Sequence, residues 1–203
     1  MSNIVDRRVE RTKRDLKEAF LDLSITNSTY EITIKEITNH ANYNRATFYA
    51  HYQDKESLVN EIIEDALNGL IQAIQFSYPQ ISILNLQQLP LASVKIFEYI
   101  YKNRSTFSIL LNQNKFPKFQ EQFCHTIIKL LKYDSQYVTP AFKKLDREVW
   151  EYAEAYALYG MLDYWAKNEF KQTIEYMNIQ LMERLKFRPE TVKYSANIRD
   201  FKD

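Results

Sequence analysis

The sequence predicts an all-α protein in which a small N-terminal three-helix head is joined by a long helix to a larger helical bundle. Three observations lead to this fold class. Apolar residues recur at intervals of three and four in most segments of the 203 residues, without a clear alternating β pattern. Glycine is scarce, with Gly69 and Gly160 the only two, beside five prolines. The stretch from Thr33 to Lys55 has the spacing of a helix-turn-helix.

The first helix is expected over about residues 7–25. One face of it is apolar at helical spacing and packs on the helices that follow: Val9, Leu16, Ala19, Phe20 and Leu23. The same helix holds a local basic excess, from Arg7, Arg8, Arg11, Lys13, Arg14 and Lys17 against Glu10 and Asp15. The formal net charge of +1 says little about partners, whereas a local cluster is a footprint for phosphate. The alternative is an ordinary solvated helix surface.

The next two helices are short, and their ends are marked by polar side chains. Thr33 and Glu36 have the spacing of a capping box, which satisfies free backbone N–H groups at a helix start. Asn42 stands where the chain must reverse, and asparagine tolerates the left-handed conformation of a tight turn. Asn44 then caps the second short helix. Its apolar edge comes from Phe48 and Tyr52, spaced i, i+4.

Asp54 caps a longer helix that reaches about Ile74 and connects the head to the body. We therefore divide the chain into a head of residues 1–57 and a body of residues 58–203. Body helices are expected at about 88–103, 105–113, 117–133, 143–167 and 171–187, with prolines near starts or breaks. Residues 81–86, ISILNL, favour helix or loop over strand, and the tail after Pro189 is expected to be mobile.

Composition excludes several classes of protein. Phosphate-cradling loops and dinucleotide fingerprints need clustered glycines, which this chain lacks. Cys124 is the single cysteine, which fits a reducing, cytoplasmic compartment, and the chain does not start with a signal peptide. The uncharged run from Ala66 to Val94 is broken by polar residues and prolines, so no membrane span is expected.

Catalytic and metal-binding patterns are absent from the sequence. Cys124 and His125 are adjacent, and neighbours on a helix point about 100° apart, so they make poor nucleophile–base partners. No metal-ligand spacing occurs either, so we expect neither an enzyme nor a cofactor. A small helical enzyme remains the most remote alternative.

The stretch from Thr33 to Leu58 is similar to the DNA-binding signature of TetR/AcrR-type transcriptional regulators. The residues in step with that signature are Thr33, Ile34, Ile37, Ala41, Asn44, Ala46, Thr47, Phe48, Tyr49, His51, Tyr52, Asp54, Lys55, Glu56 and Leu58. One position departs from it, because Asn42 stands where the family usually has glycine. The match is specific over about 25 residues, and the resemblance is strong over residues 7–60 and only architectural beyond them.

Candidate DNA contacts divide by role. Phosphate contacts are expected from Thr47, Tyr49, His51, Lys55 and, on the first helix, Arg14. The resemblance itself supports Tyr49, His51 and Lys55 in this role. The alternative is that Tyr49 and His51 pack and hydrogen-bond within the head, and that Lys55 is a solvated charge.

Base contacts are expected at the front of the second short helix. Asn44, Arg45 and Tyr43 can project there into a major groove, since arginine pairs best with guanine and asparagine with adenine. Thr33, at the start of the preceding helix, completes the candidate set.

Aromatic residues gather in the body, among 15 tyrosines and 12 phenylalanines in all. A cavity lined by such rings suits a small apolar or aromatic ligand, and the resemblance implies a ligand pocket in this part of the chain. The candidate lining residues are Phe97, Tyr101, Phe107, Phe123 and Tyr156. The alternative, which we favour for most of these rings individually, is that they fill the core or a dimer interface.

The last two long helices carry a candidate dimer interface. Small residues lie near one another on the first of them and permit close helix approach, and bulkier residues surround them: Trp150, Ala153, Ala157, Gly160, Met177 and Leu181. The resemblance implies that these helices pair with their copies in a homodimer. The alternative is an ordinary buried helix.

Together these expectations describe a cytoplasmic, dimeric regulator that binds double-stranded DNA at a palindromic operator, most simply as a repressor. A protein-interaction coactivator on the same fold, without DNA binding, is the main alternative.

Overall fold

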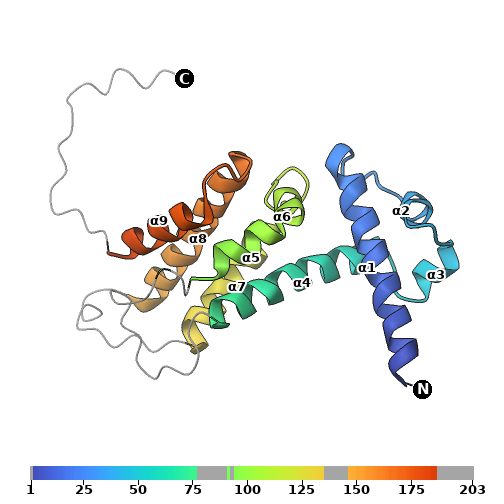
Figure 1. Cartoon of the computed structure of the whole chain (residues 1–203), viewed down its shortest axis with the longest axis horizontal. Helices are drawn as coiled ribbons and strands as arrows, with labels where there is room; N and C mark the ends of the chain where they lie inside the picture. The colour runs from blue at the N-terminus through green and yellow to red at the C-terminus, as the bar shows by residue number, and fades with distance from the viewer. Residues whose placement is uncertain (1, 77–90, 92–93, 135–145, 187–203) are drawn as a thin grey trace.

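The structure, a computed structural model, describes residues 2–76, 91, 94–134 and 146–186. Every regular element in these residues is a helix, so the all-α class is confirmed. The helices are α1 (Ser2–Thr26), α2 (Ile34–His40), α3 (Arg45–Tyr49), α4 (Lys55–Phe76), α5 (Ile96–Lys102), α6 (Arg104–Leu110), α7 (Phe119–Asp134), α8 (Arg147–Lys167) and α9 (Ile174–Lys186). In Figure 1, α1–α3 form a head at one end, α5–α9 form a body at the other, and α4 runs between them.

The head closes around a core to which each of its helices contributes. Leu16 and Phe20 come from α1, and Ile37, Phe48 and Leu58 come from α2, α3 and α4 in turn. All five side chains are fully buried in one apolar cluster. The predicted apolar faces of these helices are therefore the faces that pack, and they fix the position of the short α3 against α1 and α4.

Ion pairs join the head to the connector α4. Lys13 and Lys17 of α1 lie with their Nζ atoms 2.9 and 3.2 Å from the two carboxylate oxygens of Glu61, and Lys17 also pairs with Asp65. Burial alone would raise the pKa of Glu61, but hydrogen bonds from Lys13 and Lys17 outweigh it and the pKa is lowered from its ordinary 4.5. These ion pairs hold α1 across the first part of α4, and Figure 1 shows how the two helices cross.

The connector meets the body through one of the two glycines. A Cβ at Gly69 would overlap the ring and hydroxyl of Tyr99 on α5, and it would lie 2.7 Å from Tyr99 Cε2. The Tyr99 hydroxyl donates a hydrogen bond of 3.2 Å to the carbonyl of Ala66. The missing side chain at residue 69 therefore sets how closely α5 approaches α4.

A second contact links head and body at the end of α1. Lys115, in the loop between α6 and α7, donates from Nζ to the carbonyl oxygens of Ser24 and Ile25, the latter at 2.8 Å. The Thr29 hydroxyl donates to the Lys115 carbonyl at 2.8 Å. A cation at a helix C-terminus satisfies carbonyls that have no partner within the helix. The body thus caps a helix of the head.

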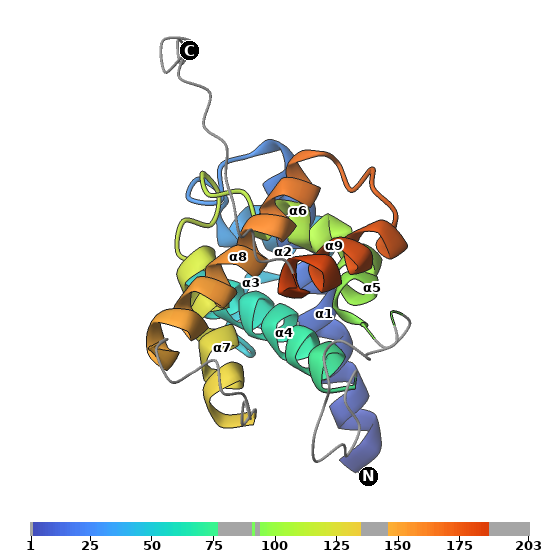
Figure 2. The ribbon, with the colours of Figure 1, turned by 90° about the vertical axis from the view of Figure 1, so that its left-hand side faces the viewer.

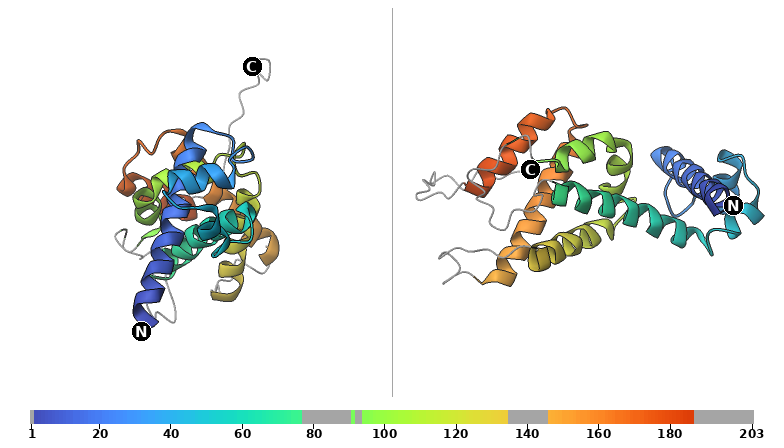
Figure 3. Two further views of the ribbon diagram at one scale, coloured as in Figure 1. Left: turned by 90° about the vertical axis from the view of Figure 1, so that its right-hand side faces the viewer. Right: turned by 60° about the horizontal axis from the view of Figure 1, so that its bottom comes forward.

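The body packs around Trp165 of α8. Its ring lies edge-on to Phe97 and Phe170, with centroids 5.6 and 5.1 Å apart, and stacks on Tyr101 at 5.9 Å. The Trp165 Nε1–H donates to the carbonyl of Gln172 at 3.0 Å, so the buried indole is fully satisfied. In Figure 3, α7 and α8 lie side by side, and in Figure 2, α8 and α9 face the viewer on the side away from the head.

Helix boundaries in the body differ from the expected ones mainly at α5. It begins at Ile96, because a turn closed by Val94 N–H and the Leu91 carbonyl at 3.2 Å precedes it. Asp146 caps α8, with its carboxylate accepting from the N–H groups of residues 148 and 149. The expectations for residues 81–86, for the segment near residue 88 and for the tail after Pro189 lie outside the described residues.

Across the helices that the structure describes, none has the length and apolar character needed to cross a bilayer. The same residues hold no group of three or more His, Cys, Asp or Glu side chains arranged for a metal ion.

Candidate nucleic-acid interface

The candidate interface is built on a pair of short helices whose starts are firmly capped. The Thr33 N–H donates to Glu36 Oε2 at 2.8 Å and the Glu36 N–H donates to Thr33 Oγ1 at 3.3 Å, which is the predicted capping box. Hydrogen bonds from Thr33 lower the pKa of Glu36 below its ordinary value. Thr33 itself is exposed, and its N–H group and its hydroxyl both donate to the Glu36 carboxylate.

The turn between α2 and α3 adopts the predicted conformation. Asn42 has a φ of 57°, in the left-handed region that asparagine tolerates. The Tyr43 N–H then donates to the Thr38 carbonyl at 2.8 Å. Asn44 caps α3, since its Oδ1 accepts from the Thr47 N–H at 2.8 Å and from the Thr47 hydroxyl at 3.0 Å. The side-chain oxygen of Asn44 is thus committed to the cap, and its amide N–H₂ remains available for a base.

The outer face of α3 presents the side chains expected at DNA. Arg45 is exposed, and its guanidinium forms no hydrogen bond or ion pair with the part of the chain that the structure describes. Tyr49 is half exposed, with its ring edge-on to the buried Phe48 at 5.7 Å. His51, just after α3, is partly buried. A guanidinium on a rigid helix beside an aromatic hydroxyl is suited to a groove edge and its phosphates.

Lys55 has a role that sequence reasoning missed. Its Nζ donates three hydrogen bonds of 2.8–2.9 Å, to the carbonyl oxygens of Thr29, Tyr30 and Ile32. Burial lowers its pKa, and the nearby Glu36 carboxylate opposes that change. All three ammonium protons are therefore used inside the head, where they hold the α1–α2 loop against the start of α4.

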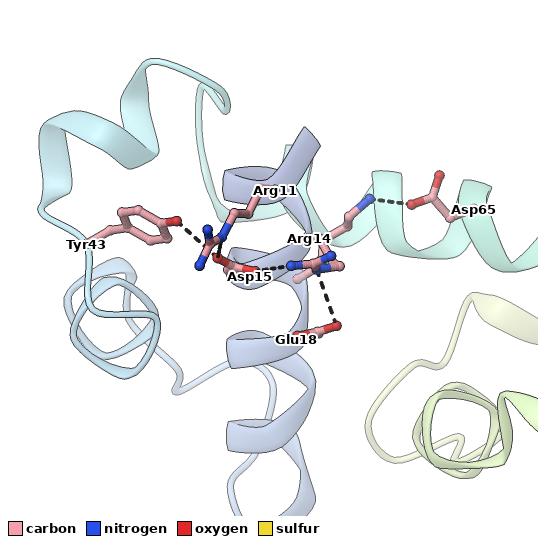
Figure 4. Close-up of polar contacts among 7 residues, drawn as sticks. Arg11, Arg14, Asp15, Glu18, Tyr43 and Asp65 are labelled. Atoms are coloured by element: carbon pink, nitrogen blue, oxygen red, sulfur yellow. Dashed lines mark hydrogen bonds and ion pairs between the residues drawn. The ribbon is translucent and has the colours of Figure 1, made fainter. Parts of the chain in front are cut away.

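Tyr43 also points inward, to a carboxylate on α1. Its hydroxyl donates to Asp15 Oδ2 at 3.0 Å, and the same oxygen lies 3.7 Å from Arg11 Nε. Arg14 Nη2 donates to Asp15 Oδ1 at 3.1 Å, and Arg14 Nε lies 3.8 Å from Glu18. Figure 4 shows the four contacts together. The sequence indicates Asp15 only as a charge that opposes the basic cluster, and its i, i+4 spacing from Arg11 is the signal that identifies it as a partner.

Comparison with known proteins identifies the family to which this arrangement of helices belongs. Residues 24–62 match the family described as "Bacterial regulatory proteins, tetR family", and residues 87–186 match one described as "Transcriptional regulator C-terminal region". The chain belongs to the TetR family of transcriptional regulators. The N-terminal head is the DNA-binding domain of that family, and the relatives are regulators rather than enzymes.

Individual relatives agree with the assignment. The "Uncharacterized HTH-type transcriptional regulator YxbF" of Bacillus subtilis (strain 168) is 25% identical over 174 residues, covering 86% of this chain and 44% of that longer relative. The chain therefore spans less than half the length of the curated relative that it matches. A TetR regulator from Streptococcus agalactiae 2603V is 22% identical, with a TM-score of 0.61 over 91% of this chain and 99% of that one. The "Dihydroxyacetone kinase operon activator DhaS" is 20% identical, with a TM-score of 0.57 over 86% and 93%.

In the C-terminal domain of this TetR-family chain, the predicted pocket aromatics lie in or against the core. Phe97, Phe107 and Phe123 are fully buried. Tyr101 stacks on Trp165, and Tyr156 stacks on Tyr152 with ring centroids 4.8 Å apart. The three phenylalanine rings pack edge-on against neighbouring rings and fill the core. None of the five predicted residues borders the hollow described next.

A hollow of about 140 Å³ lies between α4, α5, α7, α8 and α9. Aliphatic side chains form most of its wall, and one ion pair, between Glu154 Oε2 and Arg184 Nη1 at 2.7 Å, stands in it. Its lining residues are Ile74, Val94, Ile96, Ile127, Leu130, Leu131, Glu154, Leu158, Leu181, Arg184 and Leu185.

The predicted dimer residues separate into two groups. Ala153 and Gly160 are exposed on α8, Ala157 and Trp150 are partly buried, and a Cβ at Gly160 would meet no atom within 4 Å. Other exposed apolar or aromatic side chains lie on the same helix, Val149, Tyr152 and Tyr164, and on α9, Tyr176 and Ile179. By contrast, Met177 is buried within its own chain and Leu181 borders the hollow, so neither lies on this exposed surface.

Proposed function

We propose that the protein is a homodimeric repressor that binds a palindromic operator in double-stranded DNA and responds to a small apolar ligand in its C-terminal domain. The observation that carries the DNA-binding proposal is the rigidly capped α3 with Arg45 and Tyr49 exposed on its outer face. Arg45 and the Asn44 amide lie closest to the bases in this proposal, whereas Tyr43, whose hydroxyl donates to Asp15, holds the start of α3 in position. Thr47, Tyr49, His51 and Arg14 contact phosphates.

Lys55 is proposed to stabilise the head and not, in the first place, to contact a phosphate. Because its three donors already bind the carbonyl oxygens of residues 29, 30 and 32, a phosphate contact requires that one of them be released. We therefore assign Lys55 first to holding the loop before α2, and Thr33 to starting α2. In these roles both residues fix the segment that precedes α3 and do not contact DNA themselves.

Dimerisation follows from the surface of α8 and α9. One small head gives weak binding, whereas two heads on a twofold axis read both halves of a palindrome. The exposed face around Ala153, Gly160 and Tyr152 supports this proposal. It belongs to α8, which lies on the side of the body away from the head (Figure 2). As a regulator of chromosomal DNA, the dimer is expected in the cytoplasm.

We propose repression rather than activation as the effect of DNA binding. Repression is the simplest outcome of a dimer that occupies promoter DNA. The structurally similar protein DhaS, by contrast, is described as an activator. The hollow beside Glu154 and Arg184 is the site we propose for an apolar ligand. Its signal reaches the head through α4 and through Lys115, which touch both parts.

Selection of bound sequences from a random duplex pool tests DNA binding and reports the half-site spacing. Against the selected site, Arg45→Ala should weaken binding by about 5- to 150-fold per half-site, as expected for loss of one bidentate base contact of about 1–3 kcal/mol. Arg104→Ala, the same change on the exposed surface of α6, should leave binding unaltered. A chain that recovers no sequence and shows no salt-dependent affinity for any duplex would instead be the interaction module that does not bind DNA.

Sedimentation velocity tests the dimer. Ala153→Glu places a charge on the exposed face of α8 and should convert a dimer into monomers at micromolar concentration. Ala50→Glu, the same substitution at an exposed position of the head, should leave the dimer intact. Equal behaviour of the two variants would remove the α8 face from the interface.

A further inference from the structure

We propose that Asp15 is a specificity-determining residue, which restrains Arg11 and Arg14 from sequence-independent phosphate binding while it positions Tyr43 at the start of α3. The inference rests on the proposed DNA-binding function and goes beyond it by naming a residue that contacts neither base nor phosphate. Its basis is the group of contacts in Figure 4.

Both oxygens of the Asp15 carboxylate are engaged. Oδ2 accepts from the Tyr43 hydroxyl at 3.0 Å and lies 3.7 Å from Arg11 Nε, and Oδ1 accepts from Arg14 Nη2 at 3.1 Å. The Asp15 side chain is 24% exposed, against 74% for Arg11 and 63% for Arg14. The carboxylate is therefore less exposed to solvent than the two guanidinium groups, whose remaining N–H donors can reach a phosphate.

This arrangement changes how the two arginines act on DNA. Sequence-independent affinity depends on the number of phosphates that basic side chains neutralise, and it falls with salt with a slope of about −0.9 per phosphate. Asp15 cancels one of the two positive charges of these arginines, and Glu18, 3.8 Å from Arg14 Nε, offsets Arg14 further. Asp15 thus lowers attraction to any duplex, and a correctly seated site recovers the contacts only when phosphates replace the carboxylate at Arg11 and Arg14.

The same carboxylate reaches the reading helix through Tyr43. That residue stands between Asn42, whose φ is 57°, and Asn44, which caps α3. The bond from Tyr43 to Asp15 spans 28 residues and ties the front of α3 to the middle of α1. The Asp15 side chain therefore links two events. A movement that takes its carboxylate away from Arg11 and Arg14 also shifts Tyr43, and with it the start of α3.

Asp15→Asn separates the charge from the hydrogen bond, because the amide oxygen still accepts from Tyr43. For a random duplex, its affinity at about 100 mM salt should rise roughly threefold to tenfold, and the salt slope should steepen by about one unit, which is about 3.5-fold between 50 and 200 mM. Affinity for the selected operator should rise less, so the ratio of specific to non-specific affinity falls. Asp22→Asn is the matched control, since it removes the same charge from α1 at a residue whose partner is His40.

Four results decide the inference. Equal salt slopes for Asp15→Asn and Asp22→Asn would overturn it, and so would weaker binding of random duplex by Asp15→Asn, which would mean that Asp15 prepares the arginines for phosphate. Asp15→Glu should keep the wild-type slope, and Tyr43→Phe should lower operator affinity with the slope on random duplex unchanged. Wild-type protein that binds no duplex at all would overturn the proposed function instead, so the two failures are distinct.

Discussion

Gly69 offers the sharpest test of how the connector is fixed to the body. Gly69→Ala places a methyl group into the ring of Tyr99, with Cβ 2.7 Å from Cε2, and displaces the hydroxyl from its bond to Ala66. Overpacking costs about 1–3 kcal/mol and the lost hydrogen bond about 1 kcal/mol. Alanine in place of glycine inside a helix recovers about 1 kcal/mol of propensity. The net loss in unfolding free energy should therefore be about 1–3 kcal/mol.

A double-mutant cycle with Tyr99→Ala isolates the clash. In the Tyr99→Ala background the methyl group meets no ring, so Gly69→Ala should stabilise by about 1 kcal/mol through helix propensity. The expected coupling between the two positions is thus about 2–4 kcal/mol, measured by urea unfolding at constant protein concentration. Additive effects of the two substitutions would refute the close approach of α5 to α4 at this point.

Three further predictions concern contacts that hold the head. Glu61, whose pKa is lowered by its lysine partners, contributes stability that is present above pH 4.5, its ordinary pKa, and is lost as pH falls through its lower folded value. Glu61→Gln should therefore flatten the acid side of the profile of unfolding free energy against pH. Lys55→Met leaves three loop carbonyls without their donor and should lower the melting temperature by several degrees, with less loss on Lys55→Arg, in calorimetry. Lys115→Met removes the cap on α1 and should speed amide exchange at the end of that helix while exchange in α8 stays unchanged.

Local structure of the head was predictable because its signals act over three or four residues. The capping box at Thr33, the left-handed Asn42 and the caps at Asn44 and Asp54 all occur as expected. Each depends on a side chain and a nearby N–H group, and the sequence displays both. Helical periodicity likewise located the buried faces, including fully buried Phe48.

The roles of Tyr43 and Lys55 were not predictable in the same way. Tyr43 bonds to a residue 28 positions earlier, and Lys55 bonds to carbonyl groups 23 to 26 positions earlier. Such contacts depend on how α1, α2 and α4 pack, which no local pattern reports. A signature residue can thus match its family while its side chain serves the scaffold in the free protein.

The body was less predictable for a different physical reason. Aromatic side chains suit both a core and a cavity, and composition does not distinguish the two. In this chain Phe97 and Phe107 fill the core, and the hollow is bounded by residues such as Ile127 and Leu158, which have no distinguishing sequence signal. The DNA contacts and the ligand site both stay predictions for the experiments above.

The two attachments of the head limit the motion by which a ligand can act on DNA binding. A head held by α4 alone could tilt in any direction, but Lys115 also holds the far end of α1. Points of attachment at the start of α4 and at the end of α1 leave rotation about the line joining them as the least opposed motion. In the proposed response, a ligand beside Leu158 and Arg184 that shifts α7 or α4 would turn the head about that line. In the proposed dimer, such a turn would change the separation of the two α3 helices. Loss of the Lys115 cap should accordingly weaken the response of DNA binding to ligand more than it weakens DNA binding itself.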